Sequence, residues 1–133
     1  SMIGLDKRWL EPYGIDPDTA FVALIPYSGQ VVTHFERRRE LGLPDTQPLV
    51  DDMAPLSYVR PDCRPMLILS GDREREMLGR YEENAYFWRM MRVAGHPDVR
   101  ICEFDGFDHG NMPQAGHFVA VRYIREMERR MDR

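Results

Sequence analysis

Two polar clusters in the second half of the sequence contain residues that could perform acid–base chemistry. The first is Ser70-Gly71-Asp72-Arg73-Glu74, and the second runs from Phe104 through Asp105, Gly106, Phe107, Asp108 and His109 to Gly110. A carboxylate that accepts a hydrogen bond from one imidazole nitrogen fixes the tautomer of the ring, and the other nitrogen can then deprotonate a serine. His109 and an acid of the first cluster are therefore candidates for a base and its partner.

A structural interpretation of the same residues stays open. An acid just after a strand is often only a turn former or a helix cap. A histidine beside glycine is commonly a solvated loop residue. Asp105, Asp108, His109 and His117 could also be imagined as metal ligands, but their spacing matches no metal-binding motif, and we expect neither a metal nor a cofactor.

Alternating strands and helices are expected to position these clusters. Apolar runs at 20–25 and 66–70 are typical of buried strands, and residues 99–104 are expected to form a third strand that is more polar and therefore nearer an edge. Prolines interrupt residues 44–65. Helices are expected over 30–42 and 80–94 and from Ala115 to Met131. We expect apolar stripes at Tyr81, Ala85, Trp88 and Met91 of the second helix, and at Ala120, Ile124, Met127 and Met131 of the third.

This order predicts an α/β fold with about three parallel strands and flanking helices in three layers. Strand 66–70, helix 80–94 and strand 99–104 form a βαβ unit, whose strands must be parallel. Functional sites of open parallel sheets form beyond the carboxyl ends of the strands. The two polar clusters follow two such ends, so we expect them to lie side by side.

Length and composition restrict the class of protein. The 133 residues suit a single domain spanning 1–133, with Ser1 resembling a tag remnant, and the net charge of −4 excludes the basic surface of a nucleic-acid binder. No apolar run approaches the roughly 18 residues of a membrane helix. Two cysteines, Cys63 and Cys102, without a leader segment suggest free thiols and a cytoplasmic location.

The stretch Pro65–Glu74, the following amphipathic helix and Phe104–Gly110 together resemble the C-terminal half of the α/β-hydrolase fold, in its carboxylesterase and lipase branch. In that family a Gly-x-x-Asp/Glu loop carries the acid of the catalytic triad, and a Gly-x-x-His-Gly loop carries its histidine. The resemblance implies that Glu74 is the acid and His109 the base, with Asp72 as a rival acid.

The nucleophile motif of this family, Gly-x-Ser-x-Gly, is absent. Ser28 and Ser70 lie at the ends of expected strands without that motif, so structural or site-lining roles are expected for them. The leading hypothesis is a C-terminal fragment of a serine carboxylesterase or lipase that is inactive alone and would act on a small ester only with its nucleophile-bearing half. The alternative is a non-catalytic α/β module that associates with itself.

Assembly is the last expectation. Run 20–25 is apolar on both faces and would form the open edge of a narrow sheet. Such an edge exposes unpaired N–H and C=O groups. We therefore expect a homodimer or a higher oligomer that uses this strand and residues 2–13.

Overall fold

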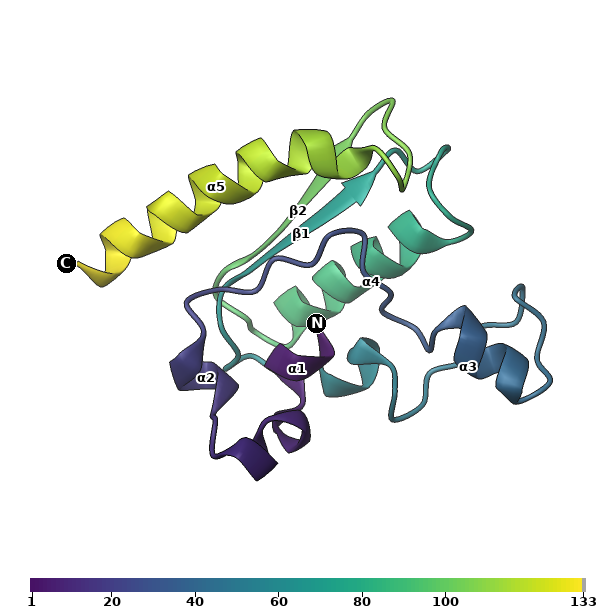
Figure 1. Cartoon of the computed structure of the whole chain (residues 1–133), viewed down its shortest axis with the longest axis horizontal. Coiled ribbons are helices and arrows are strands. Elements are labelled where there is room, and N and C mark those ends of the chain that lie inside the picture. The colour runs from purple at the N-terminus through teal and green to yellow at the C-terminus, as the bar shows by residue number, and fades with distance from the viewer. Residues whose placement is uncertain (133) are drawn as a thin grey trace.

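The computed structural model, which describes residues 1–132, has a two-stranded parallel sheet between two long helices (Figure 1). Strand β1 (Met66–Gly71) pairs with β2 (Val99–Phe104) in a register that matches Met66 with Val99. Helix α4 (Arg80–Val93) connects the two strands and forms the expected βαβ unit. Helix α5 (Met112–Met131) follows β2. The predicted α/β class is confirmed.

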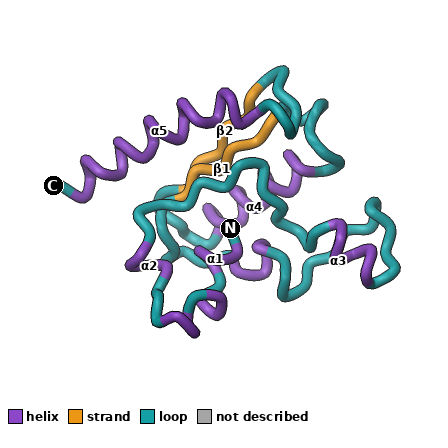
Figure 2. The backbone as a smooth tube through the Cα atoms, in the orientation of Figure 1, coloured by secondary structure: helices purple, strands orange, loops and turns teal. Residues whose placement is uncertain are grey.

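The first half of the chain consists of short helices and loops (Figure 2). The helix expected over 30–42 is confined to α3 (Phe35–Glu40), and the proline-rich region 44–65 contains one helical turn. The short elements outside α3 are α1 (Met2–Leu5), η1 (Lys7–Trp9), η2 (Glu11–Tyr13), α2 (Pro17–Ala20) and η3 (Pro55–Tyr58).

The third expected strand is an interrupted one, which we call the edge segment (residues 22–28). Leu24 and Tyr27 form parallel bridges with β1, and the backbone hydrogen bonds to β1 involve residues 24, 26 and 28. A regular ladder would also need an N–H from residue 26, but Pro26 has none. The missing donor breaks the ladder, so the sheet has two full strands and one bridged segment instead of three strands.

Side chains of β1 alternate between two hydrophobic clusters, one on each face of the sheet. Met66 and Ile68 pack with Phe87 and Met91 of α4. On the other face Leu67 and Leu69 belong to a cluster with the α5 residues Met112, Ala120, Tyr123 and Met127. Every residue of β1 is buried, which agrees with the prediction of a central strand covered by helices.

Both long helices are rotated relative to the predicted stripes. In α4 the buried positions are Arg80, Asn84, Phe87 and Met91, so only Met91 of the predicted stripe is buried. In α5 Ala120 and Met127 are buried as expected, whereas Ile124 and Met131 are exposed. The hydrophobic periodicity located the helices but did not fix their rotation, because apolar residues also lie on their flanks. No helix within residues 1–132 has both the length and the apolar character needed to cross a membrane.

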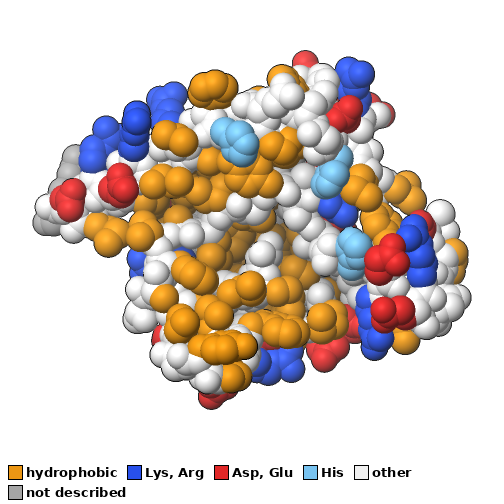
Figure 3. Space-filling view, viewed as in Figure 1, with side chains coloured by type: hydrophobic (Ala, Val, Ile, Leu, Met, Phe, Trp, Pro, Cys, Tyr) orange, Lys and Arg blue, Asp and Glu red, His pale blue; other side chains and the backbone are white. Residues whose placement is uncertain are grey.

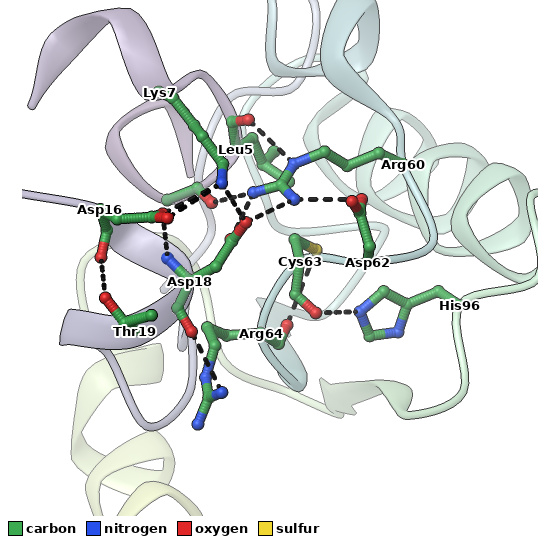
Figure 4. A network of polar contacts seen from close by, with 11 residues as sticks. Leu5, Lys7, Asp16, Asp18, Thr19, Arg60, Asp62, Cys63, Arg64 and His96 are labelled. Carbon is green, nitrogen blue, oxygen red and sulfur yellow. Dashed lines mark hydrogen bonds and ion pairs between the residues drawn. The ribbon is translucent and has the colours of Figure 1, made fainter. Parts of the chain in front are cut away.

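A polar network ties the first residues of the chain to the loop before β1 (Figure 4). Arg60 donates to both carboxylate oxygens of Asp18 and to the Leu5 carbonyl, and Lys7 lies 2.7 Å from Asp18. Beside it, His96 Nε2 is 3.0 Å from the carbonyl oxygen of Cys63. These contacts place α1 and α2 next to the start of the edge segment.

Candidate active site

The loops that follow β1 and β2 lie side by side, as the topology requires. Asp72 joins them: its N–H donates to the Phe107 carbonyl over 2.8 Å, and its carboxylate accepts from the Gly106 N–H, also at 2.8 Å. The same carboxylate accepts from the Glu74 N–H. Asp72 therefore holds the two loops together through backbone contacts.

The turn after β1 brings Glu76 back to the end of the strand. The Glu76 N–H donates to the Asp72 carbonyl, and the Glu76 carboxylate accepts from the Gly71 N–H at 3.0 Å. Its side chain is fully buried. A Cβ at Gly71 would lie 2.6 Å from the Phe107 carbonyl oxygen and 3.0 Å from Glu76 Oε1, so only glycine permits this close approach.

Glu76, His109 and Ser28 form one cluster of hydrogen bonds. His109 Nδ1 lies 3.0 Å from Glu76 Oε2 and 3.0 Å from Ser28 Oγ. The Ser28 hydroxyl donates to Glu76 Oε1 over 2.5 Å. The three residues come from the edge segment, the loop after β1 and the loop after β2, so the cluster spans the carboxyl ends of the whole sheet.

The environment of Glu76 favours its ionised form. Burial raises the pKa of this carboxyl, but hydrogen bonds from Ser28, Gly71 and Met77 and the charge of His109 outweigh burial and leave the pKa below its ordinary value. An ionised carboxylate is acceptor-only, so Nδ1 of His109 must be the donor in their contact.

This arrangement leaves the second nitrogen of His109 open. Among residues 1–132, both hydrogen bonds of the ring involve Nδ1, and 43% of the His109 side chain is exposed. With the hydrogen on Nδ1, Nε2 carries the lone pair. The geometry is that of a base oriented through Nδ1, with Nε2 free of hydrogen bonds to the described residues.

Ser28 contacts the wrong nitrogen to be activated by this base. In a triad the serine meets Nε2 and the acid meets Nδ1, whereas Ser28 and Glu76 share Nδ1. Ser28 is buried and adopts the left-handed backbone region, with φ of +42°, and its carbonyl accepts from Arg80 at 2.6 Å. Its hydroxyl thus supports Glu76, in agreement with the expected site-lining role.

The acid in contact with His109 is therefore Glu76, whereas the sequence pointed to Glu74 with Asp72 as a rival. Glu74 is exposed, and Asp72 is occupied by the backbone N–H groups of Glu74 and Gly106. Counting positions from Gly71 placed the acid at Glu74. In the structure the tight turn at Asp72 instead directs Glu76 toward His109. The alternation of acids in Asp72-Arg73-Glu74-Arg75-Glu76 was the available signal. Ser70 is buried away from this cluster's hydrogen bonds.

The structure also contains a cavity of about 460 Å³. It is lined by Val32, Arg38, Asp45, Thr46, Pro48, Leu78, Gly79 and Glu83. Leu78 and Gly79 follow Glu76 closely in sequence, and Val32 follows Ser28. Ser28, Glu76 and His109 do not themselves line the cavity. Within residues 1–132, no three His, Cys, Asp or Glu side chains are grouped so that they could hold a metal ion.

No family model matches the sequence, and no curated protein matches it. Solved structures do match. Esterase 2 of Thermogutta terrifontis phosphoramylated by tabun is 22% identical with a TM-score of 0.60, and the match covers 79% of this chain and 41% of that one. The native form of the same enzyme, from a Planctomycetes species, is 20% identical with a TM-score of 0.58, covering 86% and 45%. The chain spans less than half the length of these structures, and its fold is part of the α/β-hydrolase fold.

Proposed function

We propose that this chain carries the histidine–carboxylate part of a serine ester hydrolase, and that the nucleophile comes from outside residues 1–133. His109 acts as general base and then as general acid through Nε2, and Glu76 holds the ring in the Nδ1–H tautomer. Ser28 is a positioning residue, because it touches the acid and Nδ1 and not the reacting nitrogen. The observation that carries the proposal is a half-exposed histidine whose Nδ1 contacts a buried carboxylate and whose Nε2 has no hydrogen bond to any of residues 1–132.

Two further observations support this function. The structures that the chain resembles are esterases. The cavity beside Leu78 and Gly79 exposes more apolar than polar surface, although Arg38, Asp45 and Glu83 also line it, and such a surface suits the acyl or alcohol part of an ester. The substrate class we propose is a small carboxylic ester, and no cofactor is needed for this chemistry.

The first test is ester hydrolysis by two proteins, residues 1–133 alone and a chain extended upstream of Met2 along its own reading frame. With p-nitrophenyl acetate, we expect residues 1–133 to be no faster than their His109→Ala variant. We expect the extended chain to turn over, and His109→Ala in it to lower kcat/KM by about 10⁴-fold or more. The Glu74→Gln variant serves as a control and should keep its activity.

Two outcomes would overturn the proposal. One is an extended chain that carries no Gly-x-Ser-x-Gly motif or shows no turnover dependent on His109. The other is turnover by residues 1–133 together with labelling of Ser28 by a fluorophosphonate, which would make Ser28 the nucleophile.

The second candidate function is a non-catalytic module that associates with itself. The edge segment favours it, because its outer backbone groups form no hydrogen bonds within residues 1–132. If the extended chain is inactive, the non-catalytic module becomes the favoured function.

A further inference from the structure

Arg80 is a buried cation at the first residue of α4. Figure 3 shows Lys and Arg side chains at the surface along α5 and around α3, whereas Arg80 is only 5% exposed. Its Nε lies 2.8 Å from Glu83 Oε1, and the Glu83 side chain is 11% exposed. A buried charge is costly unless an opposite charge and hydrogen bonds compensate it. Glu83 thus balances the charge of Arg80, and the Nη groups of the guanidinium remain available for a second contact.

The second contact of Arg80 is with the turn that carries Ser28. Arg80 Nη1 donates to the Ser28 carbonyl over 2.6 Å. One turn further along α4, Asn84 Nδ2 donates to the Gly29 carbonyl over 2.8 Å and also to the Arg80 carbonyl. The N–H of Ser28 donates to the Leu69 carbonyl of β1. The backbone of Ser28 is therefore held on one side by the sheet and on the other by α4.

The backbone conformation of Ser28 needs such support. Its φ of +42° is the one positive φ of a non-glycine residue among residues 1–132. This region of the backbone map is unfavourable for a residue with a Cβ, and it persists only where the surrounding contacts fix it. From this conformation the Ser28 hydroxyl donates to Glu76 and lies 3.0 Å from His109 Nδ1. The hydrogen bonds of the Ser28 backbone thus decide where its hydroxyl lies.

We propose that Arg80 is a positioning residue for the acid–base pair formed by Glu76 and His109. The Arg80 guanidinium fixes the Ser28 carbonyl and with it the left-handed turn. The Ser28 hydroxyl, placed by that turn, then holds the Glu76 carboxylate in the orientation that meets His109. Among the hydrogen bonds of residues 1–132, none joins the Arg80 side chain to the acid–base pair, so Arg80 acts through Ser28. This inference rests on the proposed function, because it explains how the proposed base is oriented.

Arg80→Lys is the substitution that tests this role. Lysine keeps the positive charge that Glu83 requires, but it offers one nitrogen where Arg80 uses Nε and Nη1. We expect the ammonium to stay with Glu83, so the Ser28 carbonyl loses its donor and the Ser28 hydroxyl leaves Glu76. Burial raises the pKa of Glu76, and the hydrogen bond from Ser28 is the first of the contacts that lower it. Arg80→Lys should therefore raise the pKa of Glu76, which a ¹³C NMR titration of its carboxyl carbon in residues 1–133 measures.

Ser28→Ala separates positioning from a general effect on the fold. If Arg80 acts through the Ser28 hydroxyl, Arg80→Lys raises the pKa of Glu76 in the natural sequence and leaves it unchanged in the Ser28→Ala background. Phe87→Leu is the matched control, because it loosens the packing of α4 without touching Ser28, and it should leave the pKa of Glu76 unchanged. A missing rise in Arg80→Lys, or an equal rise with and without the Ser28 hydroxyl, would overturn the proposal.

Asn84→Ala tests the same support through its second donor. This variant removes the hydrogen bond to the Gly29 carbonyl and keeps Arg80 with its charge. We expect the pKa of Glu76 to rise here as well, and again only where the Ser28 hydroxyl is present. If circular dichroism shows that Arg80→Lys does not fold, Asn84→Ala decides the question, and an unchanged pKa of Glu76 in it would refute the role of α4.

Activity of the extended chain is the second readout. Arg80→Lys should lower kcat by roughly 10- to 100-fold and leave KM within about twofold, because the base loses its orientation while the groups that bind substrate stay in place. An extended chain without turnover would overturn the proposed function alone, since the change in the pKa of Glu76 needs no nucleophile. An active extended chain whose kcat does not respond to Arg80→Lys would refute the positioning role of Arg80.

Discussion

At the residue scale, the site is organised around one buried carboxylate that receives only donors. Ser28, Gly71, Met77 and His109 all direct a hydrogen at Glu76. A charged acceptor in a buried position gains from each of these donors, and it would be costly to leave unpaired. The orientation of His109 is thus a consequence of how Glu76 is held.

We predict that neutral His109 carries its hydrogen on Nδ1. In Glu76→Gln the amide has one oxygen for four donors, so the fraction of the Nδ1–H tautomer should fall. The ¹⁵N chemical shifts of the two ring nitrogens measure this fraction, at about pH 8, where imidazoles are largely neutral. Glu74→Gln is the matched control and should match the natural sequence. An Nε2–H tautomer in the natural sequence would contradict the assignment of Glu76.

A second residue-scale prediction concerns acid stability. The pKa of Glu76 is lower in the folded protein than its ordinary value of 4.5, so its ionisation stabilises the fold above about pH 4.5. This contribution is lost as the pH falls through the native pKa. Urea unfolding at a series of pH values should show a shallower loss of stability below pH 4.5 in Glu76→Gln than in Glu74→Gln. Identical slopes would show that Glu76 is not the carboxylate responsible.

The sequence indicated His109 and the loop that contains its acid, but not which acid. Strand ends and glycines can be recognised from residue types alone. The choice between Glu74 and Glu76 depends on the turn at Asp72, whose geometry is set by a contact with Phe107. That contact lies between loops far apart in the chain, so local patterns contain no record of it.

At the element scale, α4 packs against the sheet through one buried face. The apolar pattern predicted most residues of this face one position too late in the sequence. Phe87 is 1% exposed and packs against β1 residues in the cluster of Met66 and Ile68, while its neighbour Tyr86 is 55% exposed. Arg80 and Asn84 share the buried face because they donate hydrogen bonds to the backbone carbonyls of Ser28 and Gly29, respectively. A search for hydrophobic periodicity does not detect polar residues that are buried because they form such hydrogen bonds.

Phe87→Ala should therefore destabilise the fold by about 3–5 kcal/mol, because it leaves a cavity under the sheet. Tyr86→Ala, on the exposed side of the same turn, should change the free energy of unfolding by less than about 1 kcal/mol. Urea denaturation of both variants measures the difference. Comparable losses would mean that α4 is rotated relative to the structure described.

The edge segment shows a similar limit of prediction from the sequence. The run 20–25 was expected to be a full strand, but Ala20 belongs to α2, and the segment pairs with β1 only through parallel bridges at Leu24 and Tyr27. Pro26 breaks the ladder toward β1 and leaves the outer edge intact. The direction in which a proline faces depends on register, and register is decided by tertiary pairing.

At the scale of the whole molecule, the structure contains part of a larger architecture. The βαβ unit and the covering helices were predicted from sequence, because strand order and a parallel crossover constrain topology strongly. The N-terminal third was not, since its short helices are stabilised by contacts such as Arg60–Asp18 instead of by periodic apolar faces. The resemblance to solved esterases covers 79% of this chain and 41% of the esterase chain.

The cluster at the sheet's end also has a consequence for how the chain folds. Ser28 is separated by 48 residues from Glu76 and by 81 from His109. Contacts between such distant residues close larger loops than the pairing of β1 with β2, whose partners Met66 and Val99 are 33 residues apart. We therefore expect the contacts of Ser28 with Glu76 and His109 to be among the last to form during refolding. A ring-nitrogen signal from His109 would then mark the moment at which the native topology is complete.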